Sequence, residues 1–237
     1  MKKSEVYNSN SIDHFFRGAF SVDILLITYH DKKLKILLQE KKEIPFQNEC
    51  GLPGELILPN EDVDEAMEKL MTSLVGQSNF YKKQLTTFSN INRHPLGRIV
   101  TFAYYGLIPF ERLNQNLSSE LKWCEISKLP KLILDHNDIF EKVLQHFRED
   151  LLSHAIVFHI LPDKFILSDV IHVYEQTLDE TFDVRNFRKK ILSSGTIKPL
   201  GEFRKSKSHG GRPAELYELN TNKKKIVKDR IRFDLFN

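Results

Sequence analysis

The chain has 237 residues, of which 41% are hydrophobic and 28% charged, a composition typical of a globular protein with room for two domains. It contains no apolar run of membrane-spanning length and no signal-peptide core after Met1, so we expect a cytoplasmic protein without membrane contact. Its only cysteines, Cys50 and Cys124, are too few for a disulfide framework or a zinc site.

Charge is distributed unevenly along the chain. Residues 182–237 contain 15 Lys and Arg against 6 Asp and Glu, whereas residues 1–181 contain 20 against 26. A basic module joined to an acidic one is typical of a domain that binds nucleic-acid phosphates. A solvated lysine-rich tail would give the same count, so charge alone leaves both interpretations open.

The first half of the chain alternates strand and helix patterns. Residues 20–29 and 35–39 predict strands joined by a turn at 30–33, and their continuous apolar character indicates burial on both faces. We expect further strands at 85–89, 98–107 and 122–125, and a helix from about 136 to 148.

A helix is predicted over residues 63–75. Asp62 is placed to cap it, Glu65 to complete a capping box, and Gly76 to end it. Leu70 and Leu74 fall on its apolar stripe, so both are expected to pack inward.

The segment around this helix resembles the Nudix box, in which Gly, five residues, Glu and seven residues precede Arg-Glu-hydrophobic-x-Glu-Glu-x-Gly. Glu61, Lys69, Met71 and Gly76 fit that frame, and Glu55 takes the place of the first glycine. In a Nudix enzyme the three helix carboxylates gather Mg²⁺ around a diphosphate. Their positions here are occupied by Leu70, Ser73 and Leu74. We therefore predict a domain that binds a ligand without metal, cofactor or hydrolysis.

The second half follows a different pattern, which predicts a boundary between a sensing domain at 1–150 and a second domain at 151–237. Ser168 is placed to cap a helix that ends near Thr177, and Asp183 to cap a second helix over 184–194, closed by Gly195. Strand-like runs follow at 196–203 and 215–219. This is the order of a winged helix-turn-helix domain.

The second helix has the character of a DNA-recognition helix. Val184, Phe187 and Ile191 are predicted to face the core, which leaves basic and amide side chains outward. An exposed, charged surface helix remains the alternative. The predicted DNA-binding residues are Arg185, Asn186, Arg188, Lys189 and Lys190 on this helix, and Arg204, Lys205, Lys207 and Arg212 on the wing. The lysine-rich stretch 223–232 either adds phosphate contacts or is a solvated tail.

Taken together, the degraded box, the segment 134–136, the helix at 185–190 and the Gly-Arg-Pro sequence at 211–213 resemble Nudix-related transcriptional regulators. The resemblance implies a mixed α+β fold, with a Nudix α/β/α sandwich over roughly 18–148 followed by the winged helix. It also implies a homodimer that binds a palindromic double-stranded DNA operator and responds to a small effector. Members respond to ADP-ribose-type nucleotides, and residues 92–98 and 158–162 look closest to a branch that responds to sugars such as arabinose. We therefore expect a sugar or sugar derivative as the effector.

Polar side chains beside the apolar runs indicate a ligand pocket where a Nudix domain receives its ligand. Surface charges or satisfied internal hydrogen bonds are the alternative for each of them. The predicted ligand-binding residues are Asp23, Gln39, Lys41, Glu55, Arg93, Arg98 and His136.

Three other functions remain open at the level of sequence: a Nudix hydrolase of ADP-ribose-like substrates, an ADP-ribose-sensing regulator of NAD metabolism, and a non-catalytic sensor whose basic end binds RNA or protein. The missing carboxylates argue against the hydrolase. RNA-binding modules usually display stacking aromatics, whereas Phe187 is predicted to point inward.

Overall fold

The computed structural model describes residues 18–42, 44–113, 117–204 and 213–220. A mixed seven-stranded sheet forms its centre, with strand order β3-β2-β1-β6-β5, β4 pairing with β1, and β7 pairing with β2. The strands are β1 Gly18–His30, β2 Lys33–Glu40, β3 Cys50–Gly51, β4 Gly54–Leu56, β5 Tyr81–Phe88, β6 Arg98–Leu107 and β7 Leu121–Glu125.

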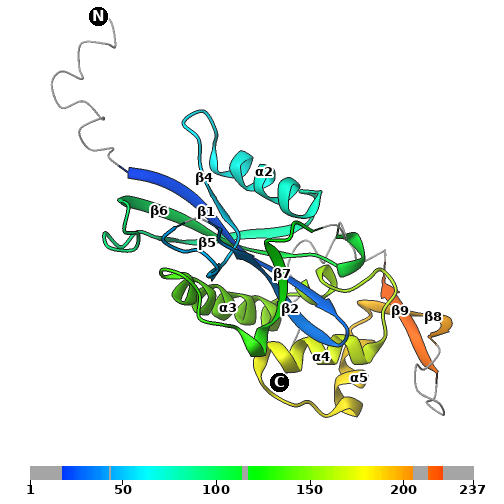
Figure 1. The fold of residues 1–237 in the computed structure, drawn as a ribbon. Coiled ribbons are helices and arrows are strands. Elements are labelled where there is room, and N and C mark those ends of the chain that lie inside the picture. The colour runs from blue at the N-terminus through cyan, green and yellow to red at the C-terminus, as the bar shows by residue number, and fades with distance from the viewer. Residues whose placement is uncertain (1–17, 43, 114–116, 205–212, 221–237) are drawn as a thin grey trace, which may run out of the picture.

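Strand β1 lies in the middle of this sheet, and its residues 22–29 are all buried, as its apolar run predicts. Alternate side chains of a strand point to opposite faces. Val22, Ile24 and Leu26 accordingly join one core, while Leu25, Ile27 and Tyr29 join the other. The sheet is thus covered on both faces, with α2 on one side and α3 on the other (Figure 1).

Helix α2 spans Val63–Val75, as predicted. The Asp62 carboxylate accepts from the Glu65 amide, and the Glu65 side chain accepts from the Asp62 amide, which completes the capping box. Gly76 ends the helix with φ 78°, a left-handed conformation that glycine adopts without steric cost.

Helix α3 spans His136–Ser153, so the predicted end near Arg148 was wrong by more than a turn. The additional turn is held by the sheet, because Leu151 is fully buried and the Asp150 carboxylate accepts from Lys83 Nζ and Tyr105 Oη, both at 2.6 Å. Strand β5 likewise begins at Tyr81 instead of residue 85, since it pairs with β6 from Leu107 onward.

The remaining elements form the winged helix-turn-helix unit that the sequence predicts. They lie beyond the end of β1 and β2, where α4 packs against β2 (Figure 1). One continuous hydrophobic core joins them to the α3 face of the sheet. The elements are the short 3-10 helix η4 Ile156–His159, helices α4 Leu167–Leu178 and α5 Val184–Ser193, and the hairpin β8 Ile197–Arg204 with β9 Ala214–Leu219.

Two sequence predictions about these helices were wrong. Helix α4 begins at Leu167 after the extended residue Ile166, so Ser168 lies inside the first turn and provides no N-cap. The helix therefore begins two residues earlier than predicted, and its first residue, Leu167, is buried. Val184 is 60% exposed because it lies at the first position of α5, before the helix reaches the core, whereas Phe187 and Ile191 are buried as predicted.

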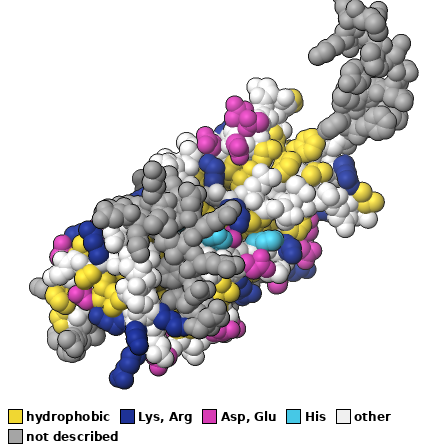
Figure 2. Space-filling view, turned by 180° about the vertical axis from the view of Figure 1, so that it is seen from behind, with side chains coloured by type: hydrophobic (Ala, Val, Ile, Leu, Met, Phe, Trp, Pro, Cys, Tyr) yellow, Lys and Arg dark blue, Asp and Glu magenta, His cyan; other side chains and the backbone are white. Residues whose placement is uncertain are grey.

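The surface of the sandwich carries some apolar side chains. Phe20, Leu56 and Leu58, on and just beyond β1 and β4, are between 37% and 51% exposed. Figure 2 shows hydrophobic side chains gathered on the face seen from behind. Within the described residues, no helix combines the length and apolarity needed to cross a membrane.

Candidate ligand pocket and DNA-binding surface

A cavity of about 180 Å³ opens between β1, the β3–β4 segment, the loop before β6 and the start of α3. Five of the predicted ligand-binding residues line it, although they come from segments far apart in sequence. They are Asp23, Lys41, Glu55, Arg93 and His136.

Arg93 forms a fixed wall of the pocket, because its side chain is only 3% exposed. Its Nε and Nη2 donate to the two carboxylate oxygens of Asp135 at 2.8 and 2.9 Å, and its Nη1 donates to Thr101 Oγ1 at 2.8 Å. A buried guanidinium needs such charge-assisted partners. The protein therefore fixes the orientation of the Arg93 guanidinium. The Oδ2 atom of Asp23 lies 3.9 Å from Arg93 Nη2.

Asp23 is the buried carboxyl of the pocket, at 6% exposure. Burial raises its pKa, while the nearby His136 and Arg93 partly oppose the rise. Gly54 lies directly against it: a Cβ at that position would be 1.9 Å from Asp23 Oδ1 and 2.8 Å from the Val22 carbonyl. Only a glycine lets the chain pass over this carboxyl.

His136, the first residue of α3, carries a defined tautomer. Its Nδ1 accepts from the Leu52 amide at 2.9 Å, and an amide N–H can only donate, so the proton of the neutral ring is on Nε2. Burial lowers the pKa of His136, although the Asp23 and Asp135 carboxylates oppose the fall. The ring thus offers one hydrogen-bond donor to the pocket.

The other predicted pocket residues lie at its rim or outside it. Gln39 accepts from Lys41 Nζ at 2.9 Å, so it orients that lysine without lining the cavity. Arg98 is exposed at the start of β6, paired with Gly18, and is not among the lining residues. Sequence reasoning missed Thr101 and Asp135, although a threonine within an apolar strand and an aspartate just before a helix are visible signals.

The side chains at the three metal-binding positions of the Nudix box have structural contacts in this protein. Leu70 and Leu74 are 4% and 8% exposed and pack in the core beneath α2, while Ser73 donates to the Leu70 carbonyl at 2.8 Å. Among the described residues, no group of three or more His, Cys, Asp and Glu side chains is placed to hold a metal ion.

Ion pairs nevertheless connect helix α2 to the residues that precede it in the box-like segment. Lys69 Nζ lies 3.1 Å from Glu55 and 3.2 Å from Glu61, and the Glu61 carboxylate also accepts from the Leu58 amide. That backbone hydrogen bond, together with Lys69, lowers the pKa of Glu61. Glu55 is thus held at the edge of the pocket by a residue of α2.

Helix α5 presents the predicted DNA-reading side chains. Arg185, Asn186 and Lys189 are exposed, and Lys190 is half-buried. Asp183 caps the helix by accepting from the Asn186 amide at 2.6 Å, as predicted. This fixes the first turn, where a recognition helix meets base edges.

Two predicted DNA-binding arginines have partners within the protein. Arg188 Nη2 donates to Tyr217 Oη at 3.0 Å and lies 3.4 Å from Glu215, which ties α5 to β9. Arg204, the last residue of β8, donates to the Asp169 carboxylate at 3.1 Å. The other predicted wing residues, Lys205, Lys207 and Arg212, lie outside the described residues, as does the stretch 223–232.

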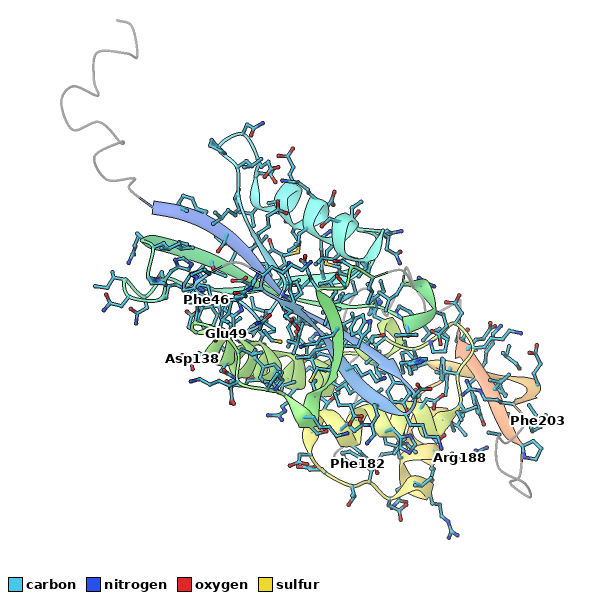
Figure 3. All side chains as sticks on the ribbon, in the orientation of Figure 1. Phe46, Glu49, Asp138, Phe182, Arg188 and Phe203 are labelled. Atoms are coloured by element: carbon cyan, nitrogen blue, oxygen red, sulfur yellow. The ribbon has the colours of Figure 1, made fainter. Side chains whose placement is uncertain are left out.

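The pocket and helix α5 lie far apart in the molecule. Figure 3 labels Phe46, which lines the pocket, and Arg188 on α5, with the central sheet between them. A group bound in the pocket would therefore make no direct contact with α5.

Comparison with known proteins identifies the C-terminal elements. Residues 157–219 match the family model described as the NrtR DNA-binding winged helix domain. This part of the chain resembles that DNA-binding winged helix domain. It contains η4, α4, α5 and the β8–β9 hairpin, and it confirms the predicted fold class together with the Nudix-like sandwich that precedes it.

Two relatives, one of them seen in two structures, extend the likeness beyond the winged helix. The chain is 26% identical over 205 residues to the ADPR responsive transcriptional repressor NtrR of Acinetobacter baylyi, covering 84% of this chain and 81% of the relative. It resembles Shewanella oneidensis NrtR complexed with a 27mer DNA at TM-score 0.74 and 27% identity, covering 85% and 93% of the two chains. The NUDIX domain of the same Shewanella protein complexed with ADP ribose matches at TM-score 0.53 and 27% identity, covering 62% and 99%.

Proposed function

We propose that this protein is a DNA-binding transcriptional repressor of the NrtR type, whose Nudix-like domain senses a ligand without hydrolysing it. The observation that carries the proposal is the joining of an NrtR-type winged helix domain to a sandwich whose metal-ligand positions are filled by buried leucines. Two-fold pairing would place two α5 helices about one DNA turn apart on a palindromic operator.

ADP-ribose is the proposed effector. The Acinetobacter relative is named for its response to ADPR, and the Shewanella NUDIX domain was crystallised with ADP ribose. The pocket provides acceptors at Asp23 and Glu55 for ribose hydroxyls, a donor at His136, and a cation at Lys41. Its volume of about 180 Å³ is below the 300–1,000 Å³ usual for enclosing a whole drug-sized ligand, so the pocket as described would hold only part of this one.

A single sugar is the second candidate, since the pocket volume suits a ligand of that size. This was the expectation from sequence. The Acinetobacter and Shewanella relatives give a sugar effector no support, because their names give ADP-ribose and neither gives a free sugar.

Absence of hydrolysis belongs to the same proposal. Phosphoanhydride cleavage in a Nudix box needs metal to neutralise the diphosphate and position water. The side chains at the three metal positions are two hydrocarbons and a hydroxyl already bonded to the Leu70 carbonyl. They provide no carboxylate for a divalent cation.

Calorimetric titration of the full chain with ADP-ribose, and separately with arabinose, tests the effector assignment. Asp23→Asn should weaken ADP-ribose binding, because it replaces the buried carboxyl, whereas Glu202→Gln on the distant strand β8 should leave binding unchanged. Arabinose binding without ADP-ribose binding would reverse the assignment. Turnover of ADP-ribose with Mg²⁺ at about 1 per second or faster would contradict the non-hydrolysing role.

A further inference from the structure

We propose that Phe46 and His94 form an aromatic subsite at the mouth of the ligand pocket, which takes the purine base of the effector while the cavity takes a ribose. The inference rests on the proposed function, since it divides the effector between two parts of the same site. It gives a role to two lining residues that sequence reasoning did not select.

The cavity itself suits a sugar better than a base. Its volume of about 180 Å³ holds only part of a nucleotide-sized ligand. Asp23 and Glu55 line it, and carboxylates accept hydrogen bonds from hydroxyls. A ribose offers several hydroxyls to these two carboxylates, whereas an adenine ring offers one amino group. With a ribose in the cavity, the base lies at the mouth.

The mouth carries two aromatic rings. Phe46 comes from the segment between β2 and β3, His94 comes from the segment before β6, and both line the cavity. Their ring centroids are 6.3 Å apart, and the interplanar angle is 61°. Two rings at this angle do not cover each other's faces, so a face is left for a third flat ring to stack on.

Packing of the hydrophobic core does not account for Phe46. Among the residues that the structure describes, two hydrophobic cores are formed, and Phe46 is a member of neither. Its loop is closed by the Lys41 amide, which donates to the Glu49 carbonyl at 2.8 Å, and by the Glu49 amide, which donates to the Phe46 carbonyl at 2.9 Å. Figure 3 labels Phe46 and Glu49 in this loop. The backbone thus holds an aromatic ring beside a polar cavity, where it can contact a ligand.

His94 is placed by its neighbour Arg93, whose buried guanidinium is bonded to Asp135 and Thr101. The His94 Nδ1 accepts from the Leu96 amide at 3.2 Å, which leaves the proton of the neutral ring on Nε2. The subsite therefore combines aromatic faces with one N–H donor. A purine satisfies both, because it has a flat ring and ring nitrogens that accept hydrogen bonds.

Removing one ring should distinguish ligands with a base from sugars. Phe46→Ala should weaken ADP-ribose binding by about tenfold or more, because it removes a stacking partner of the base. Phe46→Trp should keep the affinity. Ribose 5-phosphate has no base, so neither substitution at Phe46 should change its binding. Asp23→Asn in the cavity should weaken both ligands.

The test is calorimetric titration of the full chain with ADP-ribose, adenosine diphosphate and ribose 5-phosphate. Gln47→Ala serves as the control, because Gln47 is an exposed residue of the same loop and does not line the cavity. It should leave the binding of all three ligands unchanged.

The Phe46→Trp variant adds a direct readout of stacking. Its fluorescence should be quenched by the two adenine ligands and not by ribose 5-phosphate. The wild-type chain provides the background, because its one tryptophan, Trp123, packs against the core beneath α2.

The outcomes separate the aromatic subsite from the proposed function. The subsite alone would be overturned if Phe46→Ala weakened neither adenine ligand, or weakened ribose 5-phosphate as much. Phe46-dependent binding of adenosine diphosphate without binding of ADP-ribose would overturn the effector assignment and keep the subsite. A chain that binds none of the three ligands would overturn both.

Discussion

Asp23 and Tyr29 lie on the same face of β1, six residues apart, with Asp23 in the ligand pocket and Tyr29 against helix α4. At roughly 3.3 Å per residue this separation is about 20 Å of unbroken strand. The strand is paired with β6 along residues 18–27 and with β2 along residues 27–30. One strand therefore contributes a side chain to the pocket and, through the contact of Tyr29 with His172, another to the packing of α4.

Restoring one box carboxylate should damage the fold. Leu70→Glu places an unpaired charge in the core beneath α2, so we expect it to lower the free energy of unfolding by about 3 kcal/mol or more. Ser73→Glu is the matched control, because Ser73 is exposed on the same helix, and its cost should stay below about 1 kcal/mol. Urea denaturation measures both. Equal stability of the two variants would show that position 70 still accepts a carboxylate.

The close contact between Gly54 and Asp23 predicts that substitutions at these two positions have non-additive effects on stability. Gly54→Ala should destabilise the protein by about 1–3 kcal/mol, because its Cβ would overlap the Asp23 carboxyl. Part of this loss should return in the double variant Gly54→Ala/Asp23→Ala, although the clash with the Val22 carbonyl remains. Thermal unfolding of the four chains checks the cycle, and strictly additive losses would contradict the clash.

His136 should make stability fall in mild acid. Its folded pKa is below its ordinary value of 6.5, so the unfolded chain binds its proton first as the pH falls. The stability that neutral His136 contributes is complete above about 6.5 and is lost as the pH falls from there toward the folded pKa. His136→Gln should flatten this slope, measured by urea unfolding between pH 7.5 and 5.

Comparing the wild-type chain with the His136→Gln variant separates the contribution of His136 to the pH dependence of stability from the contributions of other titrating groups. Asp23, whose pKa is raised, contributes a slope of the opposite sign, and His94 titrates in both chains. Repeating both measurements in an Asp23→Asn background removes the opposing contribution of Asp23, so the remaining difference in slope belongs to His136. Identical slopes with and without His136 would mean that the Leu52 hydrogen bond does not keep this ring neutral.

The N-cap of α5 can be tested by comparing Asp183, which caps that helix, with Ser168, which caps no helix. Asp183→Ala should cost about 1 kcal/mol of stability, because it leaves the Asn186 amide without its acceptor. Ser168→Ala should change stability by less than about 0.5 kcal/mol, since α4 starts before it. Chemical denaturation of both variants is the measurement. A larger loss for Ser168→Ala would restore the cap predicted from sequence.

Base reading by α5 predicts a difference between two exposed residues. Arg185→Ala should weaken a duplex selected by the wild-type chain by about 1–3 kcal/mol while changing mixed-sequence DNA less. Lys198 is paired with Glu218 at 2.9 Å on the β8–β9 hairpin, so Lys198→Ala should affect both duplexes alike. Equal losses on both duplexes for Arg185→Ala would remove base recognition from this helix.

Local signals in the sequence predicted most of the fold. The N-caps Asp62 and Asp183 and the glycines that follow the helices placed α2 and α5, and the apolar runs placed β1 and β6, because these features act within a few residues. The failures at Ser168, Val184 and the end of α3 depend on contacts with distant residues. Asp150, for example, extends α3 only because Lys83 and Tyr105 meet it from the sheet.

For the candidate site too, the sequence predicted the residues but not the contacts between distant elements. Polar residues beside apolar runs identified Asp23, Arg93 and His136 as candidates, and the structure brings them together around one cavity. That Arg93 is held by Asp135 and Thr101, and that Arg204 is held by Asp169, could not be read from spacing, since each pair joins separate elements. The contact of Tyr29 with His172 likewise requires the packed structure.

The most direct test of the account is the anisotropy of the selected DNA duplex bound to the wild-type chain, titrated with ADP-ribose, with the nucleotide recovered and assayed afterwards. The account predicts that ADP-ribose weakens DNA binding by a coupling of about 1–3 kcal/mol and is recovered intact. DNA binding that is unchanged at saturating ADP-ribose, or nucleotide recovered as hydrolysis products, would contradict it.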